Sequence, residues 1–127
     1  MTQMIFYTYP SCTSCRKTKA WLKQHHIHFE ERHIFKETPN IDELMQIIQL
    51  TQGGIKEILA TRSEAFKNLD VNIDELKVSE VLRLLHDVPK LLRRPILTDG
   101  EKLIIGFNQT RLQQLQKKWM MTSKYVS

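Results

Sequence analysis

The sequence lacks the features that define several protein classes. Four glycines and four prolines among 127 residues exclude a collagen-like or low-complexity chain. No run of about 18 apolar residues is present, so the sequence predicts no transmembrane helix. The first residues lack the basic and apolar regions of a signal peptide. These absences predict a cytoplasmic protein that folds around one core and has no membrane partner.

Cysteine is also scarce, and its two copies lie close together. Cys12 and Cys15 are separated by two residues, so they cannot join distant segments as a disulfide scaffold does. A lone Cys-x-x-Cys pair in a chain without an export signal is typical of redox or metal chemistry. A zinc site needs two further ligands. The candidates are the histidines that follow, His25, His26, His28 and His33. They lie at the far end of the next predicted helix, so we expect surface histidines, no metal and no cofactor.

Acidic residues concentrate in the middle of the chain. Residues 40–80 contain eight Asp and Glu against four Lys and Arg, a net charge of −4, whereas the whole chain carries +5. The remaining residues therefore carry +9. This distribution suggests that the middle is a separate structural unit. The uneven charge has two possible explanations: charged residues that only face solvent, or a surface that binds a partner.

Hydrophobic patterning predicts a β-α-β opening and a β-β-α ending. The opening elements are a strand over 4–9, a helix over 14–25 and a strand over 27–35. The ending is a hairpin over 94–106 with Asp99–Gly100 in its turn, followed by a helix that Asn108 caps. Together they form a thioredoxin-like α/β core with a mixed four-stranded sheet.

The segment 39–89 is predicted to be wholly helical and to interrupt this core. Asn40 or Thr38 can cap its first helix, and Gly53–Gly54 ends that helix. Further helices are expected over 55–60, 63–69 and 74–85. The predicted organisation is a discontinuous redox domain over 1–38 and 90–119, a helical insertion domain over 39–89 and a flexible tail over 120–127.

The cysteine pair falls at the first strand-to-helix turn. A thiol reacts as its thiolate, and the unpaired N–H groups at the start of a helix favour negative charge. Arg16 and Lys17 add positive charge there. We therefore expect Cys12 to be the exposed, attacking sulfur with a lowered pKa, and Cys15 to resolve it into a disulfide. Two ordinary thiols that happen to share this spacing are the alternative.

Two further arginines are candidate anion ligands. Arg94 and Pro95 open the hairpin, and in a thioredoxin-like core a proline at this place faces the cysteine turn, usually after a cis bond. We predict a cis bond before Pro95, which would bring Arg94 next to Cys12 to bind an oxidised sulfur or another anion. Arg62 is the second candidate ligand. A solvated basic loop and a helix-surface arginine are the respective alternatives.

Motifs at several separated places resemble one known family. They are the stretches 10–17, 20–22, 31–32, 42–43, 57–58, 61–63 and 91–96. On these motifs, over about residues 3–118, the chain resembles the Spx family within the arsenate-reductase-like (ArsC) superfamily.

The resemblance implies a redox-sensitive transcriptional regulator rather than an enzyme. Spx-like proteins bind the C-terminal domain of the RNA polymerase α subunit and redirect transcription under stress. Oxidation of the cysteine pair, here Cys12 and Cys15, acts as the switch, and the family's glycine in the α-contact region falls on Gly54. The resemblance also implies indirect contact with promoter DNA and degradation by the ClpXP protease.

An arsenate reductase or related thiol oxidoreductase is the alternative function. Such enzymes keep one nucleophilic cysteine and three arginines around the oxyanion, and Cys12, Arg62 and Arg94 match the cysteine and two of the arginines. The third would fall in residues 105–108, which are Ile-Gly-Phe-Asn. A missing charge-assisted donor costs about 1.5–3 kcal/mol of anion binding. Direct DNA binding, suggested by a pI of 9.3, lacks a helix-turn-helix pattern.

Overall fold

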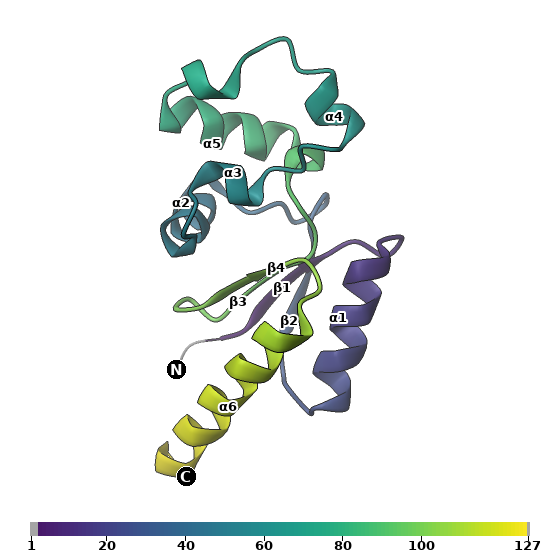
Figure 1. The fold of residues 1–127 in the computed structure, drawn as a ribbon, viewed down its shortest axis with the longest axis vertical. Helices are drawn as coiled ribbons and strands as arrows, with labels where there is room; N and C mark the ends of the chain where they lie inside the picture. The colour runs from purple at the N-terminus through teal and green to yellow at the C-terminus, as the bar shows by residue number, and fades with distance from the viewer. Residues whose placement is uncertain (1–2, 127) are drawn as a thin grey trace.

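A mixed sheet forms the centre of the protein, and helices cover both of its faces (Figure 1). The computed structural model describes the backbone of residues 3–126 and the side chains of residues 3–118. The strands are β1 (Ile5–Thr8), β2 (Glu30–His33), β3 (Ile96–Thr98) and β4 (Leu103–Ile105). They lie in the order β2-β1-β3-β4, with β1 parallel to β2 and β3 antiparallel to both of its neighbours. The predicted α/β fold with a mixed four-stranded sheet is confirmed.

Two long helices cover one face of the sheet, α1 (Thr13–Gln24) and α6 (Gln109–Val126). Successive side chains of a strand point to opposite faces. Phe6 of β1 and Leu97 of β3 therefore lie in one cluster with Leu22 of α1 and Leu112 of α6, and all four are fully buried. Burying one such side chain contributes about 1.5–3 kcal/mol, so this cluster anchors both helices.

The middle of the chain covers the other face. Its elements are α2 (Ile41–Leu50), α3 (Ile55–Ile58), α4 (Glu64–Lys67), the 3₁₀ turn η1 (Ile73–Glu75), α5 (Val78–Asp87) and the 3₁₀ turn η2 (Pro89–Leu91). Tyr7 and Ile96, which alternate with Phe6 and Leu97 along their strands, share a second cluster with Leu44 of α2 and Leu85 of α5. Because this cluster joins the helices to the sheet, a separate domain over 39–89 stays a prediction.

Local capping explains where several elements begin. Asn40 and Glu43 form a reciprocal capping box at the start of α2. Asn108 Oδ1 accepts a hydrogen bond from the Arg111 backbone N–H at 3.1 Å. The hairpin turns at Gly100, whose φ of 91° favours glycine. The predicted caps and the predicted turn are therefore confirmed.

The second strand is shorter than predicted. It was expected over residues 27–35, whereas β2 contains only Glu30–His33. The backbone N–H of Ile27 still donates to Leu22 O at 3.0 Å, closing the end of α1. Glu37 N–H donates back to His33 O at 2.7 Å. Backbone groups on both sides of β2 are thus used in local turns, which shortens the strand.

Two helix boundaries also differ from the sequence prediction. The helix expected over 74–85 is broken, because the Glu80 carboxylate accepts a hydrogen bond from Lys77 N–H at 2.9 Å and starts α5 anew. The last helix also extends further than expected, because residues 120–126 of the predicted tail belong to α6, and Ser127 lies outside the described residues. That the segment 120–127 is a flexible tail stays a prediction. Residues 109–126 contain no glycine or proline, and helix propagation adds one hydrogen bond per residue.

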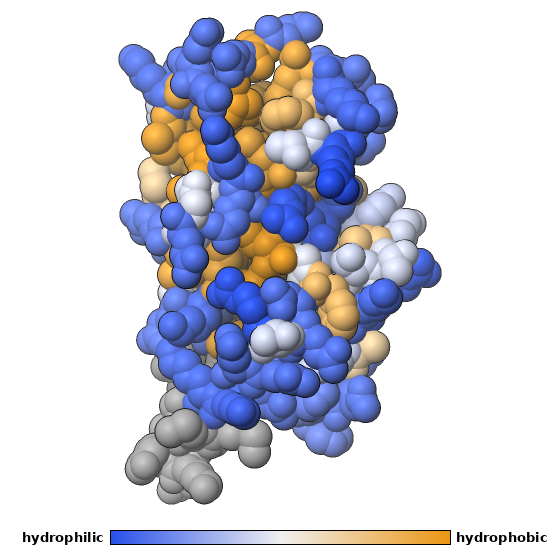
Figure 2. All heavy atoms as spheres, viewed as in Figure 1, coloured by the Kyte–Doolittle hydropathy of each residue, from blue (hydrophilic) through white to orange (hydrophobic). Residues whose placement is uncertain are grey.

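On the face drawn in Figure 2, hydrophilic residues predominate, and apolar residues gather among the helices of the layer from α2 to α5. Val71 and Val78 of that layer are each 48% exposed, and Phe107 before α6 is 37% exposed. In the part of the chain that the structure describes, no helix is both long and apolar enough to cross a bilayer.

Candidate redox site

Cys12 lies in the turn between β1 and α1 and caps the helix. Its backbone N–H donates to Tyr9 O at 3.1 Å, which closes the turn. Its Sγ accepts a hydrogen bond from the Cys15 backbone N–H at 3.3 Å. Cys12 is half-buried and carries a free thiol. The sulfur therefore lies at the N-terminus of α1 with a backbone donor aimed at it.

Cys15 sits one turn further along α1 in a different environment. It is 1% exposed, and burial raises the pKa of its thiol to about 11. A hydrogen bond to the Cys12 sulfur adds to the rise, whereas hydrogen bonds with the Thr8 side chain and the Tyr9 backbone oppose it. The two sulfurs are therefore unequal: Cys12 is the more accessible, as predicted, and Cys15 is a buried thiol.

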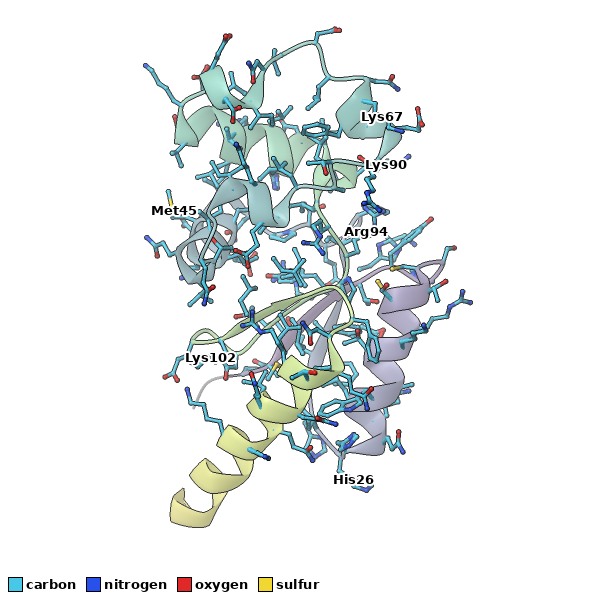
Figure 3. All side chains as sticks on the ribbon, viewed as in Figure 1. His26, Met45, Lys67, Lys90, Arg94 and Lys102 are labelled. Atoms are coloured by element: carbon cyan, nitrogen blue, oxygen red, sulfur yellow. The ribbon has the colours of Figure 1, made fainter. Side chains whose placement is uncertain are left out.

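The peptide bond between Arg94 and Pro95 is cis, as predicted. Figure 3 shows Arg94 in the connection that leads from the upper helices to the sheet. Its Nη1 donates to Leu92 O at 3.0 Å, and its Cζ lies 5.2 Å from the centre of the Phe35 ring. These partners hold the guanidinium, and a contact with Cys12 stays a prediction.

An aromatic cluster connects the Arg94 region with the cysteine turn. The Phe35 ring centre lies 4.8 Å from that of Tyr9, and Tyr9 also packs edge-on against His33 at 5.5 Å. The carbonyl of Tyr9 accepts the hydrogen bond from Cys12 N–H. Movement of the cysteine turn would therefore reach the ring on which Arg94 rests.

The remaining predicted anion ligands are exposed to solvent. Arg16 lies on the first turn of α1, next to Lys17, whose Nζ is 6.0 Å from the Phe107 ring. Arg62 lies in the turn between α3 and α4. Their role in anion binding stays a prediction. Within residues 3–118, no three His, Cys, Asp or Glu side chains are arranged to hold a metal ion.

Gly54 lies before α3 on the opposite side of the sheet. Its φ of 75° with ψ of −148° is a backbone conformation that only glycine adopts without strain. Its N–H donates to Thr51 Oγ1 at 3.0 Å. A Cβ at this position would meet no atom within 4 Å, so the position is open to a partner. That a partner binds there stays a prediction.

One partly buried network was not identified from the sequence. Arg32 Nη1 donates to Glu43 Oε2 and also to the Tyr7 hydroxyl, the latter at 3.1 Å. That hydroxyl donates to Glu43 at 3.2 Å. Burial acts to raise the pKa of the Glu43 carboxyl, but hydrogen bonds from Arg32 and from Asn40 N–H outweigh it, so the pKa is lowered. Only the capping role of Glu43 left a signal in the sequence.

The fold and the site define a class of protein. A thioredoxin-like sheet carries a Cys-x-x-Cys pair at the start of its first helix, and a helical segment covers the opposite face. A model of the ArsC family matches residues 7–115, and the chain belongs to this family.

Curated relatives narrow the class further. "Regulatory protein MgsR" of Bacillus subtilis (strain 168) is 63% identical over 116 residues, which cover 91% of this chain and 92% of the relative. "Global transcriptional regulator Spx" of the same organism is 46% identical over 108 residues, which cover 85% and 82%. The resemblance inferred from the motifs is confirmed. These relatives are named as regulators and not as enzymes.

Solved structures agree with the fold. A putative ArsC family related protein from Bacteroides fragilis superposes with a TM-score of 0.80 at 27% identity, covering 89% of this chain and 97% of that one. Coverage of 89% of this chain means that the match extends beyond the sheet to most of the helical segment.

Proposed function

We propose that this protein is a redox-sensitive transcriptional regulator that binds the C-terminal domain of the RNA polymerase α subunit and controls stress-response genes. The identity of 63% to MgsR over 91% of the chain carries the proposal. The cysteine pair supports it, because a half-buried Cys12 beside a buried Cys15 is arranged for an intramolecular disulfide.

The disulfide acts on the cysteine turn. Closing the bond between Cys12 and Cys15 removes the thiolate and restrains the first turn of α1. A series of contacts leads away from this turn. Cys12 N–H donates to the Tyr9 carbonyl, the Tyr9 ring packs on the Phe35 ring, and the Arg94 guanidinium lies over Phe35. Oxidation thereby shifts the population of two arrangements of the neighbouring surface, and the partner binds one of them more tightly.

The helical segment is the proposed binding surface. Gly54 lies at an open position on it, and residues 40–80 carry a net charge of −4. The rest of the chain carries +9 and lies near promoter DNA once the protein is bound to polymerase, which gives salt-sensitive contacts with little sequence preference. Residence in the cytoplasm and degradation by ClpXP belong to the same proposal.

The test is a calorimetric titration in which the chain, once reduced and once oxidised, is added to the isolated C-terminal domain of the polymerase α subunit. Binding at micromolar or lower Kd in either state supports the proposal, and a difference between states measures the switch. No binding in either state overturns it. Turnover of arsenate with glutathione or thioredoxin as reductant then tests the enzyme alternative.

A further inference from the structure

A hollow with a volume of about 270 Å³ lies where the last strand meets the last helix. It is lined by residues of β4, of α6 and of the turn before β4: Lys102, Ile104, Arg111, Gln114, Leu115 and Lys118. The two apolar side chains among them are buried, and the four polar ones are exposed. Figure 3 shows Lys102 on the hairpin, above α6 in this view. Three cations from two elements therefore border one concave surface.

The helix contributes its part of the hollow as a regular stripe. Arg111, Gln114 and Lys118 are spaced three and four residues apart, which places them on one side of α6. At 1.5 Å per residue, the stripe is about 10 Å long. The phosphates of one DNA strand follow one another about every 3.4 Å along the duplex axis. The stripe therefore has the length of about three phosphates.

Charge around the hollow is almost entirely positive. Residues 102–118 contain four Lys and Arg and no Asp or Glu, and α1, on the same face of the sheet, has the same composition of charge. Asp99 is 5% exposed, and its Oδ1 accepts hydrogen bonds from two backbone N–H groups of the turn. The carboxylate of Glu101 lies 3.2 Å from Lys118. Such a surface favours a polyanion.

One of the cations is already held in place. Arg111 Nη2 donates to Leu103 O at 2.9 Å, which fixes the guanidinium at the edge of β4. A guanidinium has five N–H donors, and this bond uses one of them. Because the group is positioned in advance, it loses less freedom when it binds an anion. Arg, Lys and Gln side chains, the three kinds that line this hollow, are common donors to DNA phosphates.

We propose that the β4–α6 hollow binds the phosphate backbone of duplex DNA without reading its sequence. The inference deepens the proposed function, which brings the basic part of the chain near promoter DNA, because it names the surface that makes the contact. None of the six lining residues is aromatic, so the hollow offers no platform on which the bases of a single strand stack. An extended acidic peptide carries at most one charge per about 3.3 Å, about half the charge density of the duplex.

The test measures binding of a fluorescein-labelled DNA duplex of mixed sequence to the whole chain, by anisotropy at several salt concentrations and without polymerase. Arg111→Gln and Lys102→Gln each remove one cation from the hollow, whereas Arg111→Lys keeps the charge. Lys56→Gln is the matched control, because it removes one exposed cation from the acidic layer. Glu101→Gln removes the carboxylate beside Lys118.

We expect Arg111→Gln and Lys102→Gln each to reduce the salt slope by about 0.9, as one lost phosphate contact predicts. A contact with this slope contributes about eightfold in affinity between 1 M and 0.1 M salt, so each variant should bind about eightfold more weakly at 0.1 M. Arg111→Lys and Lys56→Gln should keep the wild-type slope, and Glu101→Gln should bind more tightly. A second duplex of unrelated sequence should give the same Kd.

Equal losses in Arg111→Gln and Lys56→Gln would show an effect of net charge alone and would overturn the inference. No binding of the duplex to the wild type at low salt would overturn it as well. Tighter binding of a labelled oligo-aspartate than of the duplex would assign the hollow to an acidic protein segment instead. If Arg111→Gln fails to fold by circular dichroism, Lys102→Gln answers the same question. None of these outcomes involves the polymerase domain, whose proposed binding is tested separately by calorimetry.

Discussion

The two helical layers of this protein differ in charge and in chemistry. The layer of α1 and α6 contains the cysteine pair, and the layer from α2 to α5 contains Gly54 and most of the acidic residues. The sheet separates the layers, so a signal from the cysteines must cross it to reach the proposed binding surface. Strand β1 contributes to both sides, because Phe6 packs with α1 and α6 whereas the next residue, Tyr7, contacts Glu43 of α2. The alternation of a single strand therefore links the two layers.

Removing the attacking sulfur has the largest expected effect, because it separates the redox chemistry of one layer from the proposed binding surface of the other. Cys12→Ala should abolish the effect of oxidant on binding and leave binding of the reduced chain unchanged, because the binding surface lies on the opposite layer. Calorimetry with and without peroxide measures both quantities. An oxidant response that persists in Cys12→Ala would show that another group senses the oxidant.

The contact between β1 and the helical segment is tested through Glu43, which accepts a hydrogen bond from Tyr7. Glu43→Gln should lower the free energy of unfolding by about 1.5–3 kcal/mol at pH 7, because it removes a charged partner from Arg32 and Tyr7. The folded-state pKa of Glu43 is lowered, so its contribution is present at neutral pH and is lost as the pH falls below about 4. Urea unfolding at pH 7 and at acid pH measures the difference.

A surface ion pair provides the control for that measurement. The carboxylate of Glu31 lies 2.7 Å from Lys19, and both side chains are more than one third exposed. Glu31→Gln should cost no more than about 1 kcal/mol. Equal losses for the two substitutions would show that the Glu43 network adds nothing beyond an ordinary surface pair.

Substitution of two glycines with positive φ tests whether partner binding is confined to the surface around Gly54. Gly54→Ala should weaken binding of the polymerase domain about tenfold, because its φ of 75° strains any other residue in the proposed contact surface. Gly100→Ala, at φ of 91° in the turn between β3 and β4, should lower stability similarly and leave affinity unchanged. Calorimetry and thermal unfolding measure both variants. Equal loss of affinity at the two positions would remove the case for a localised surface.

The smallest expected effect concerns DNA. Lys23→Gln on α1 should weaken binding of the polymerase-bound protein to every promoter alike and reduce the salt slope by about one, as expected for one lost phosphate contact. Lys56→Gln, on the acidic layer, should leave the slope unchanged. Gel shifts at several salt concentrations measure both. A change in sequence preference with Lys23→Gln would point to base recognition instead.

Local chemistry made a large part of this structure predictable. The hairpin turn and the caps at Asn40 and Asn108 were predicted from it and confirmed. The cis bond before Pro95 was predicted instead from its place in a thioredoxin-like core, and it too is confirmed. The errors concern boundaries, where a cap such as the Glu80 carboxylate on Lys77 N–H outweighed the apolar pattern.

The side-chain surroundings of the site were not predictable in the same way. The contact between the Arg94 guanidinium and the Phe35 ring joins residues 59 positions apart in the chain. The Tyr7–Glu43 hydrogen bond joins residues 36 positions apart. Neither pair has a pattern in the sequence, because each depends on how separate elements pack.

The sequence by itself determined the order of the elements, the family and the position of the cysteine pair, because turns, caps and hydrophobic period act between residues close along the chain. The positions of Cys12 before the helix and Cys15 in its first turn already predicted which sulfur is the more accessible. The tertiary structure alone decided how strongly the two differ, because packing of α1 against the sheet withdraws water from Cys15 and leaves Cys12 half-buried. Desolvation is a property of the packed protein, and it raises the pKa of Cys15 in a way that no local pattern in the sequence shows.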